Sequence, residues 1–91
     1  MAEVLWEPAA IADLDDILTY IEQFDLAAAL RYEGALRALG ESLAEFPNRG
    51  RPAANGTREM TSVPPYVLGY RVERNEVRIL SIRHGRRQAR A

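Results

Sequence analysis

Apolar residues near the start of the chain recur at three- and four-residue spacing, which is the period of an amphipathic helix. This stripe comprises Ile11, Leu14, Ile17, Leu18 and Ile21. Pro8 suits the first turn of such a helix, because the N–H that proline lacks would have no partner there. The pattern predicts a helix from near Glu7 to near Phe24, preceded by a short strand over residues 3–6.

A second helix is predicted to follow after only a few residues. Asp25 is a favourable N-cap, and the alanine-rich run that begins at Ala27 favours helix. Its apolar stripe has the same period and comprises Tyr32, Leu36, Leu39, Leu43 and Phe46. Pro47 then ends the pattern. Because the connection is so short, the two helices are expected to lie antiparallel as a hairpin.

The hydrophobic period changes from helical to alternating after one clear loop. Residues 47–57 carry two prolines, two glycines and two asparagines, a composition typical of loops. A short strand is predicted over residues 58–62. Alternating apolar positions predict longer strands over residues 66–73 and 77–83, with residues 74–75 as the turn of a hairpin.

The predicted element order is β-α-α-β-β-β in one domain over residues 1–91, of which residues 84–91 form a basic tail. Helices followed by strands favour an α+β fold, with an antiparallel sheet and the helical hairpin packed on one of its faces. Tyr66 and Tyr70 alternate with aliphatic residues on one strand, so core packing is their simplest role. The other face of the sheet is left for function.

Charge separates along the chain, although the net charge is only −1. Residues 1–45 hold ten acids and two arginines, a balance of −8, and residues 46–91 hold ten arginines and three acids, a balance of +7. There is no cysteine and only one histidine, so disulfides and thiolate metal sites are excluded, and no metal or cofactor is expected. No export signal or membrane-length apolar run is present, which favours the cytoplasm.

Several stretches, in order and at the right spacing, resemble the RelE/ParE toxin superfamily across nearly the whole chain. They are Trp6 to Ala10, Asp13 to Ile17, Phe46 to Pro52, Arg58-Glu59, Pro65 to Val72, and Val77 to Arg87. The ending His84-Gly85-Arg86-Arg87 is more similar to the ParE branch than to the RelE branch. Glu7 departs from the pattern, since the family often has serine or threonine at that N-cap. The resemblance implies the growth-arresting toxin of a type II toxin-antitoxin pair.

Toxins of this superfamily arrest growth in two ways, and one of them is cleavage of messenger RNA on the ribosome. Metal-free cleavage needs a group that deprotonates the 2′-OH, a group that protonates the leaving oxygen, and cations that stabilise the phosphate. The candidate residues for such a site are Arg58, Arg71, His84 and Arg86. RelE-type nucleases typically also use lysines and a tyrosine beyond the last strand, and this chain has neither.

The other way, implied by similarity to the ParE branch, is to bind DNA gyrase and trap it on DNA. Binding needs a complementary surface and no proton-transfer groups, so an arginine-rich edge is sufficient. The candidate target-binding residues are Arg83, His84, Arg86 and Arg87. Gyrase poisoning is therefore the preferred hypothesis, and the nuclease is the alternative. The simplest alternative role for the tail arginines is a solvated chain end.

The resemblance also implies a cognate antitoxin, ParD-like or RelB-like, whose disordered segment folds around the toxin and whose own domain binds promoter DNA. Aliphatic antitoxin side chains are expected on the helical hairpin, and antitoxin carboxylates are expected on the arginine-rich half. The predicted contacts are Leu14, Ile17, Leu18, Ile21, Tyr32, Leu36, Arg58 and Arg71. A further hypothesis is a stand-alone nucleic-acid-binding module that uses the basic half, with steeply salt-dependent affinity.

Overall fold

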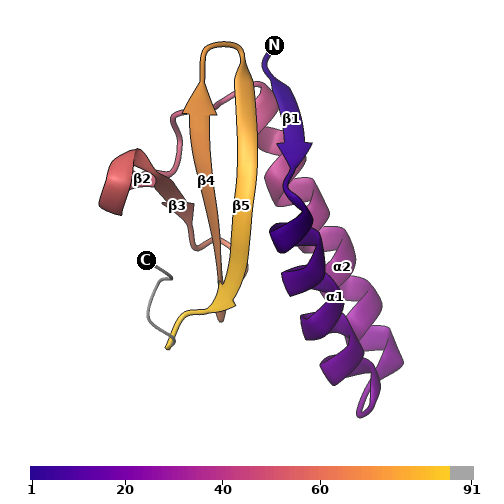
Figure 1. The fold of residues 1–91 in the computed structure, drawn as a ribbon. Coiled ribbons are helices and arrows are strands. Elements are labelled where there is room, and N and C mark those ends of the chain that lie inside the picture. Colours follow the sequence, from indigo (N-terminus) through magenta and orange to yellow (C-terminus); the bar gives the residue numbers. More distant parts are fainter. Residues whose placement is uncertain (87–91) are drawn as a thin grey trace.

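The computed structural model describes residues 1–86, which form two helices and five strands in the order β-α-α-β-β-β-β. The elements are β1 (Glu3–Trp6), α1 (Pro8–Glu22), α2 (Leu26–Glu41), β2 (Arg51–Pro52), β3 (Arg58–Met60), β4 (Tyr66–Glu73) and β5 (Glu76–His84). Helices α1 and α2 lie side by side as an antiparallel hairpin beside the sheet (Figure 1). The α+β fold class predicted from the sequence is confirmed.

The sheet is mixed, whereas the sequence predicted an antiparallel one. Its strand order is β1-β5-β4-β3-β2, and β1 pairs parallel to β5 while every other pair is antiparallel. A tight turn fixes the relative direction of β4 and β5, but β1 reaches β5 only through both helices and three strands. Side-chain alternation shows which face of the sheet a residue occupies. It does not show whether a strand far away in sequence, such as β1, runs parallel or antiparallel to its neighbour.

Most element boundaries follow local chemistry closely. Strand β3 is shorter than predicted and ends at Met60, and two further differences follow α2. Strand β4 covers the predicted residues, and Asp25 caps α2 as expected by accepting a hydrogen bond from the Ala28 N–H at 3.0 Å. Helix α2 ends at Glu41, before the predicted Pro47, because the chain tightens into a 3₁₀ turn over Ser42–Ala44. The predicted loop also contains the two-residue strand β2.

The start of α1 has no side-chain cap, because the Glu7 carboxylate is used elsewhere. It accepts a hydrogen bond from Arg78 Nη1 at 2.9 Å, and Arg78 Nη2 lies 3.3 Å from Glu76. The hydrogen bond to Glu7, with the nearby Glu76 charge, raises the pKa of Arg78 above its ordinary value. Glu7 therefore ties the start of α1 to β5, and Pro8 at N1 removes one of the N–H groups that a cap would otherwise satisfy.

The core lies between the helical hairpin and one face of the β4–β5 hairpin. Its largest fully buried side chains are Tyr70, Leu14, Leu36, Leu43, Leu68, Ile79, Ile82 and Val77. They come from helical positions on one stripe and from strand positions on one face of the sheet. In β5 a bulge opposite Gly69 and Tyr70 brings Ile82, three residues after Ile79, to the same face as Ile79. Trp6 packs against this core, and a Cβ on Gly40 would lie only 2.5 Å from its ring. Helix α2 can approach β1 this closely because residue 40 has no side chain.

Tyr70 joins the core to the loop that follows the helices. Its side chain is fully buried, and its hydroxyl donates to the Pro47 carbonyl at 2.7 Å and accepts from the Gly50 N–H at 2.9 Å. A Cβ on Gly50 would lie 2.6 Å from that hydroxyl oxygen, so only glycine permits this approach. One tyrosine hydroxyl thus fixes the start of the 47–57 loop against the sheet.

We predict that Tyr70→Phe lowers the free energy of unfolding by about 1–3 kcal/mol, because it leaves the buried Gly50 N–H without an acceptor. Tyr20→Phe removes a hydroxyl from a side chain that is 65% exposed and serves as the control. Urea denaturation of the two variants checks the difference. Equal stability of Tyr70→Phe and Tyr20→Phe would contradict the role given to this hydroxyl.

Asp13 on α1 satisfies an N–H of β5 beyond the point where β1 ends. Strand β1 pairs with β5 only as far as Ile79, and past it the side chain of Asp13 accepts a hydrogen bond from the Ile82 N–H at 3.0 Å. Asp13 is 9% exposed, so this bond is shielded from water. A buried carboxylate of the helix thus replaces the carbonyl of a neighbouring strand, and α1 covers an edge to which another strand could otherwise add.

We predict that Asp13→Ala destabilises the fold by about 1–3 kcal/mol, the cost of a buried donor without a partner. It should also speed hydrogen exchange at the Ile82 amide. Asp16→Ala removes an exposed carboxylate from the same helix and should do neither. Denaturation and amide exchange of the two variants provide the test, and unchanged protection of Ile82 in Asp13→Ala would refute the assignment.

Candidate functional site

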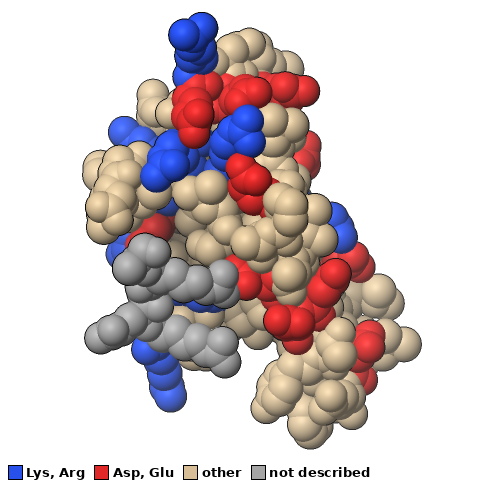
Figure 2. Space-filling model, in the orientation of Figure 1, with Lys and Arg blue, Asp and Glu red and all other residues tan. Residues whose placement is uncertain are grey.

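A groove of about 730 Å³ runs between α1 and strands β3 to β5. Asp13 and Asp16 line it from the helix, and Arg71 and Arg83 line it from the sheet. In Figure 2, acidic side chains gather over α1, and basic and acidic side chains alternate over the upper part of the sheet. The groove therefore has an acidic helix side, and on its sheet side Glu59 lies with Arg71 and Arg83.

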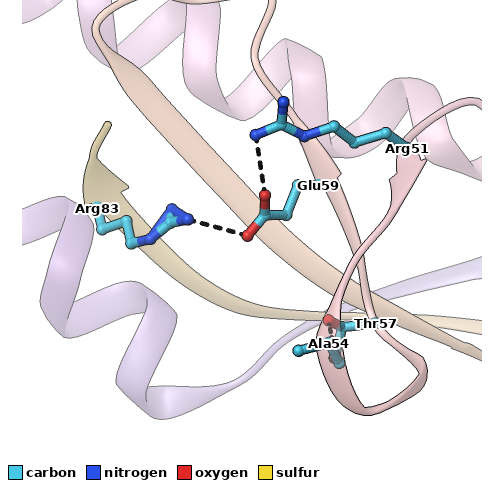
Figure 3. A network of polar contacts seen from close by, with 5 residues as sticks. All are labelled: Arg51, Ala54, Thr57, Glu59 and Arg83. Atoms are coloured by element: carbon cyan, nitrogen blue, oxygen red, sulfur yellow. Dashed lines mark hydrogen bonds and ion pairs between the residues drawn. The ribbon is translucent and has the colours of Figure 1, made fainter. Parts of the chain in front are cut away.

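A carboxylate between two arginines is the central contact of the open face of the sheet (Figure 3). Glu59 Oε1 lies 3.1 Å from Arg51 Nη2, and Glu59 Oε2 lies 3.0 Å from Arg83 Nη2. The side chains of Glu59 and Arg83 are only 15% and 16% exposed, whereas that of Arg51 is 63% exposed. Sequence analysis did not identify Glu59 as a site residue. The sequence did contain one indication of its role, because Glu59 is the first of only three acids among the ten arginines of residues 46–91.

The other two sheet arginines singled out from the sequence hold the 47–57 loop. Arg58 Nη1 donates to the Gly50 carbonyl at 2.7 Å and to the Asn48 carbonyl at 3.2 Å. Arg71 Nη2 donates to the Asn55 carbonyl at 3.3 Å. Arg58 pairs with Tyr70 across the strands and so shares its face, while Arg71, the next residue along β4, points to the opposite face. These two arginines therefore do not converge on one ligand.

His84 lies at the end of β5 opposite Tyr66, the first residue of β4. The two rings meet edge-on with centroids 6.1 Å apart, and Tyr32 of α2 contacts Tyr66 in the same way at 5.4 Å. Burial, with the neighbouring Tyr32 and Tyr20, raises the pKa of Tyr66 above its ordinary value, so its hydroxyl stays protonated at neutral pH. His84 Nδ1 accepts a hydrogen bond from the Arg86 N–H at 3.2 Å.

Of the predicted target-binding residues, the structure brings Arg83 and His84 to the groove. Arg86 is exposed at the end of the part of the chain that the structure describes. Arg87 lies outside the described residues, as does the rest of the predicted basic tail. Arg83 differs from a free surface cation, because Glu59 already binds it.

The predicted antitoxin contacts on the helices fall into two groups. Leu14 and Leu36 are each 1% exposed and belong to the chain's own core, so their side chains offer a partner almost no surface. Both occupy the middle of the apolar stripe, which faces the sheet. Ile17 and Leu18 pack partly against the core, and Ile21 and Tyr32 are partly exposed.

Large apolar side chains do reach the surface on both arms of the helical hairpin, at positions that the stripe did not include. The most exposed are Tyr20 at 65%, Phe24 at 73%, Leu26 at 61% and Leu30 at 60%. The Tyr20 and Phe24 rings are in contact, with centroids 5.4 Å apart. A signal existed in the sequence, since Leu26 and Leu30 are four residues apart and so share one face of α2, and Tyr20 and Phe24 have the same spacing around the end of α1.

Neither helix of residues 1–86 is long and apolar enough to cross a membrane. Within the same range, no three His, Asp or Glu side chains are grouped as ligands of a metal ion.

Comparison with known proteins identifies the family. A model described as the ParE toxin of the type II toxin-antitoxin system, parDE, matches residues 4–89. Toxin RelE2 of Caulobacter vibrioides is 47% identical over 87 residues, covering 96% of this chain and 99% of the relative. Toxin ParE1 of the same organism is 40% identical, covering 90% of this chain and 88% of the relative.

A solved structure agrees with these sequence relatives. A chain of the chromosomal ParDE TA system from P. aeruginosa superposes with a TM-score of 0.81 at 29% identity, covering 92% of this chain and 96% of the other. The matching model spans nearly the whole sequence, and the shared fold includes the helical hairpin and the mixed sheet. This chain belongs to the RelE/ParE family and is the toxin of a type II toxin-antitoxin system.

Proposed function

We propose that this toxin arrests growth by binding DNA gyrase and trapping it on DNA, without cleaving RNA. The observation that carries the proposal is the arrangement of the sheet arginines. Arg58 and Arg71 donate to loop carbonyls, and Arg83 binds Glu59. These contacts leave no set of cations converging on one phosphate among the described residues.

The groups available for proton transfer support the same proposal. Metal-free cleavage of RNA requires an acid and a base on opposite sides of the phosphate. The raised pKa of Tyr66 keeps its hydroxyl neutral, so Tyr66 is a poor base, and one nitrogen of His84 already accepts the Arg86 N–H. A binding mechanism needs neither group.

One observation favours the alternative function, a ribosome-dependent mRNA endonuclease. Tyr66, His84 and Arg83 all line the same groove, so one groove contains a neutral hydroxyl, an imidazole and a cation. In that case Tyr66 would donate the proton to the leaving oxygen, and His84 would accept the proton of the 2′-OH. The stand-alone nucleic-acid-binding module has less support, because Asp13, Asp16 and Glu59 line the groove as well.

The partner of the toxin in the cell is a cognate antitoxin, which the family implies. We propose that its segment covers the exposed apolar residues of the helical hairpin, Tyr20, Phe24, Leu26 and Leu30, together with Ile21 and Tyr32. Its carboxylates would contact Arg71 and the other cations of the open sheet face. Gyrase and the antitoxin would both be met in the cytoplasm, and promoter DNA would be bound through the antitoxin.

We predict that inducing the toxin alone in bacteria produces gyrase-dependent DNA breaks and loss of plasmid supercoiling while messenger RNA stays intact. Supercoiling, breaks and message integrity should be followed in one culture, with coexpressed antitoxin as the control. In-frame cuts in translated messages with normal supercoiling would reject gyrase poisoning and support the nuclease.

We predict that replacing Arg86 and Arg87 together with alanine abolishes growth arrest but leaves antitoxin binding within about threefold, roughly 0.6 kcal/mol. The reason is that the proposed antitoxin segment binds through apolar contacts on the helical hairpin, to which these two charges do not contribute. Arg31→Ala with Arg37→Ala removes the same charge from α2 and should keep the toxin active. Arrest by the Arg86/Arg87 variant equal to that of the wild type would show that the tail is a solvated chain end.

A further inference from the structure

Glu59 is an acid held inside the most basic part of the chain. It lies on β3, where the backbone register pairs it with Arg51 of β2 on one side and Gly69 of β4 on the other. Both of its carboxylate oxygens are used, one by Arg51 and one by Arg83. The two guanidinium groups therefore meet at a single anion that the chain itself supplies.

A carboxylate in this position occupies the place that a phosphate would take. Arginine forks bind phosphate and carboxylate oxygens through the same charge-assisted N–H bonds. Since Arg83 is largely buried, its attraction to an anion is screened less than that of a surface cation. The Nε of Arg83 is itself buried and has no hydrogen-bond partner among residues 1–86.

We propose that Glu59 is a specificity-determining residue, which keeps the open sheet face from binding the phosphodiester backbone of RNA. Glu59 neutralises Arg51 and Arg83 and competes with phosphate for both. Without this charge, Arg83 and Arg71 would be the charged residues of the sheet that line the groove, and Arg51 would be freed on the other side of Glu59. This inference rests on the proposed function, because it explains how an arginine-rich member of the family can bind a protein target and not be drawn to messenger RNA.

The test measures RNA affinity of the purified full-length toxin and of Glu59→Gln, which keeps the shape of the side chain and removes its charge. The probe is a fluorescently labelled oligouridylate, followed by anisotropy over a range of salt concentrations. Two freed phosphate contacts should tighten binding about tenfold or more at low salt. They should also steepen the slope of log K against log salt by about 1.4, that is about 0.7 for each contact on a single strand.

Glu73→Gln is the matched control. It removes the same charge from an exposed residue at the end of β4, where no ion pair joins it to Arg51 or Arg83. Its affinity should rise less than about threefold, and its salt slope should stay unchanged. Combining Glu59→Gln with Arg83→Gln should return the affinity toward that of the wild type, since one of the freed cations is then lost.

Circular dichroism and urea denaturation establish that each variant is folded. If Glu59→Gln is not, Glu59→Met makes the same comparison, because an apolar side chain of similar length can replace a buried ion. Equal RNA affinity and equal salt slope for the Glu59 and Glu73 variants would overturn the proposal. Cleavage of messages by the wild-type toxin in culture would instead reject the proposed function, so the two failures can be told apart.

Discussion

The structure depends on the burial of one face of the β4–β5 hairpin beneath the helical hairpin. Leu68, Tyr70 and Ile79 are fully buried there, and in a chain of 91 residues this single core supplies most of the apolar burial. Alternation along the strands sends the intervening residues, including Ser81 and Arg83, to the opposite face. The same register that builds the core thus creates the polar open face of the sheet.

The sheet arginines bind parts of the chain itself, Arg58 on the face of Tyr70 and Arg71 and Arg83 on the open face. Arg58 and Arg71 fix a loop that has little regular structure, and Arg83 shares Glu59 with Arg51. An arginine that already has a partner still contributes to the shape of the surface and to the long-range attraction of anions. Releasing it for catalysis would leave a buried carboxylate or a loop carbonyl without its donor. Such a surface is suited to recognition, which needs preorganised shape more than mobile charge.

The periodicity of the sequence predicted the helices and strands and the α+β class, but it predicted neither the long-range pairings nor most contacts of the site. Strand β4, the Asp25 cap and the helical hairpin follow from spacing and local chemistry, which nearby residues determine. The parallel pairing of β1, the bond from Ile82 to Asp13, and the Arg51–Glu59–Arg83 contact all join residues far apart in sequence. Likewise, an apolar stripe predicts which helix face is buried, so it led to the buried Leu14 and Leu36 and missed the exposed Tyr20 and Phe24.

The central claim is that the toxin acts on gyrase by binding alone, and a reaction of purified components tests it most directly. Toxin, DNA gyrase and supercoiled plasmid are incubated together, and the DNA is examined after the proteins are denatured and digested. The account predicts linear plasmid only when toxin and gyrase are both present, and its loss when the antitoxin is added. Unchanged gyrase activity, together with message cleavage when the same toxin is added to translating ribosomes, would contradict it.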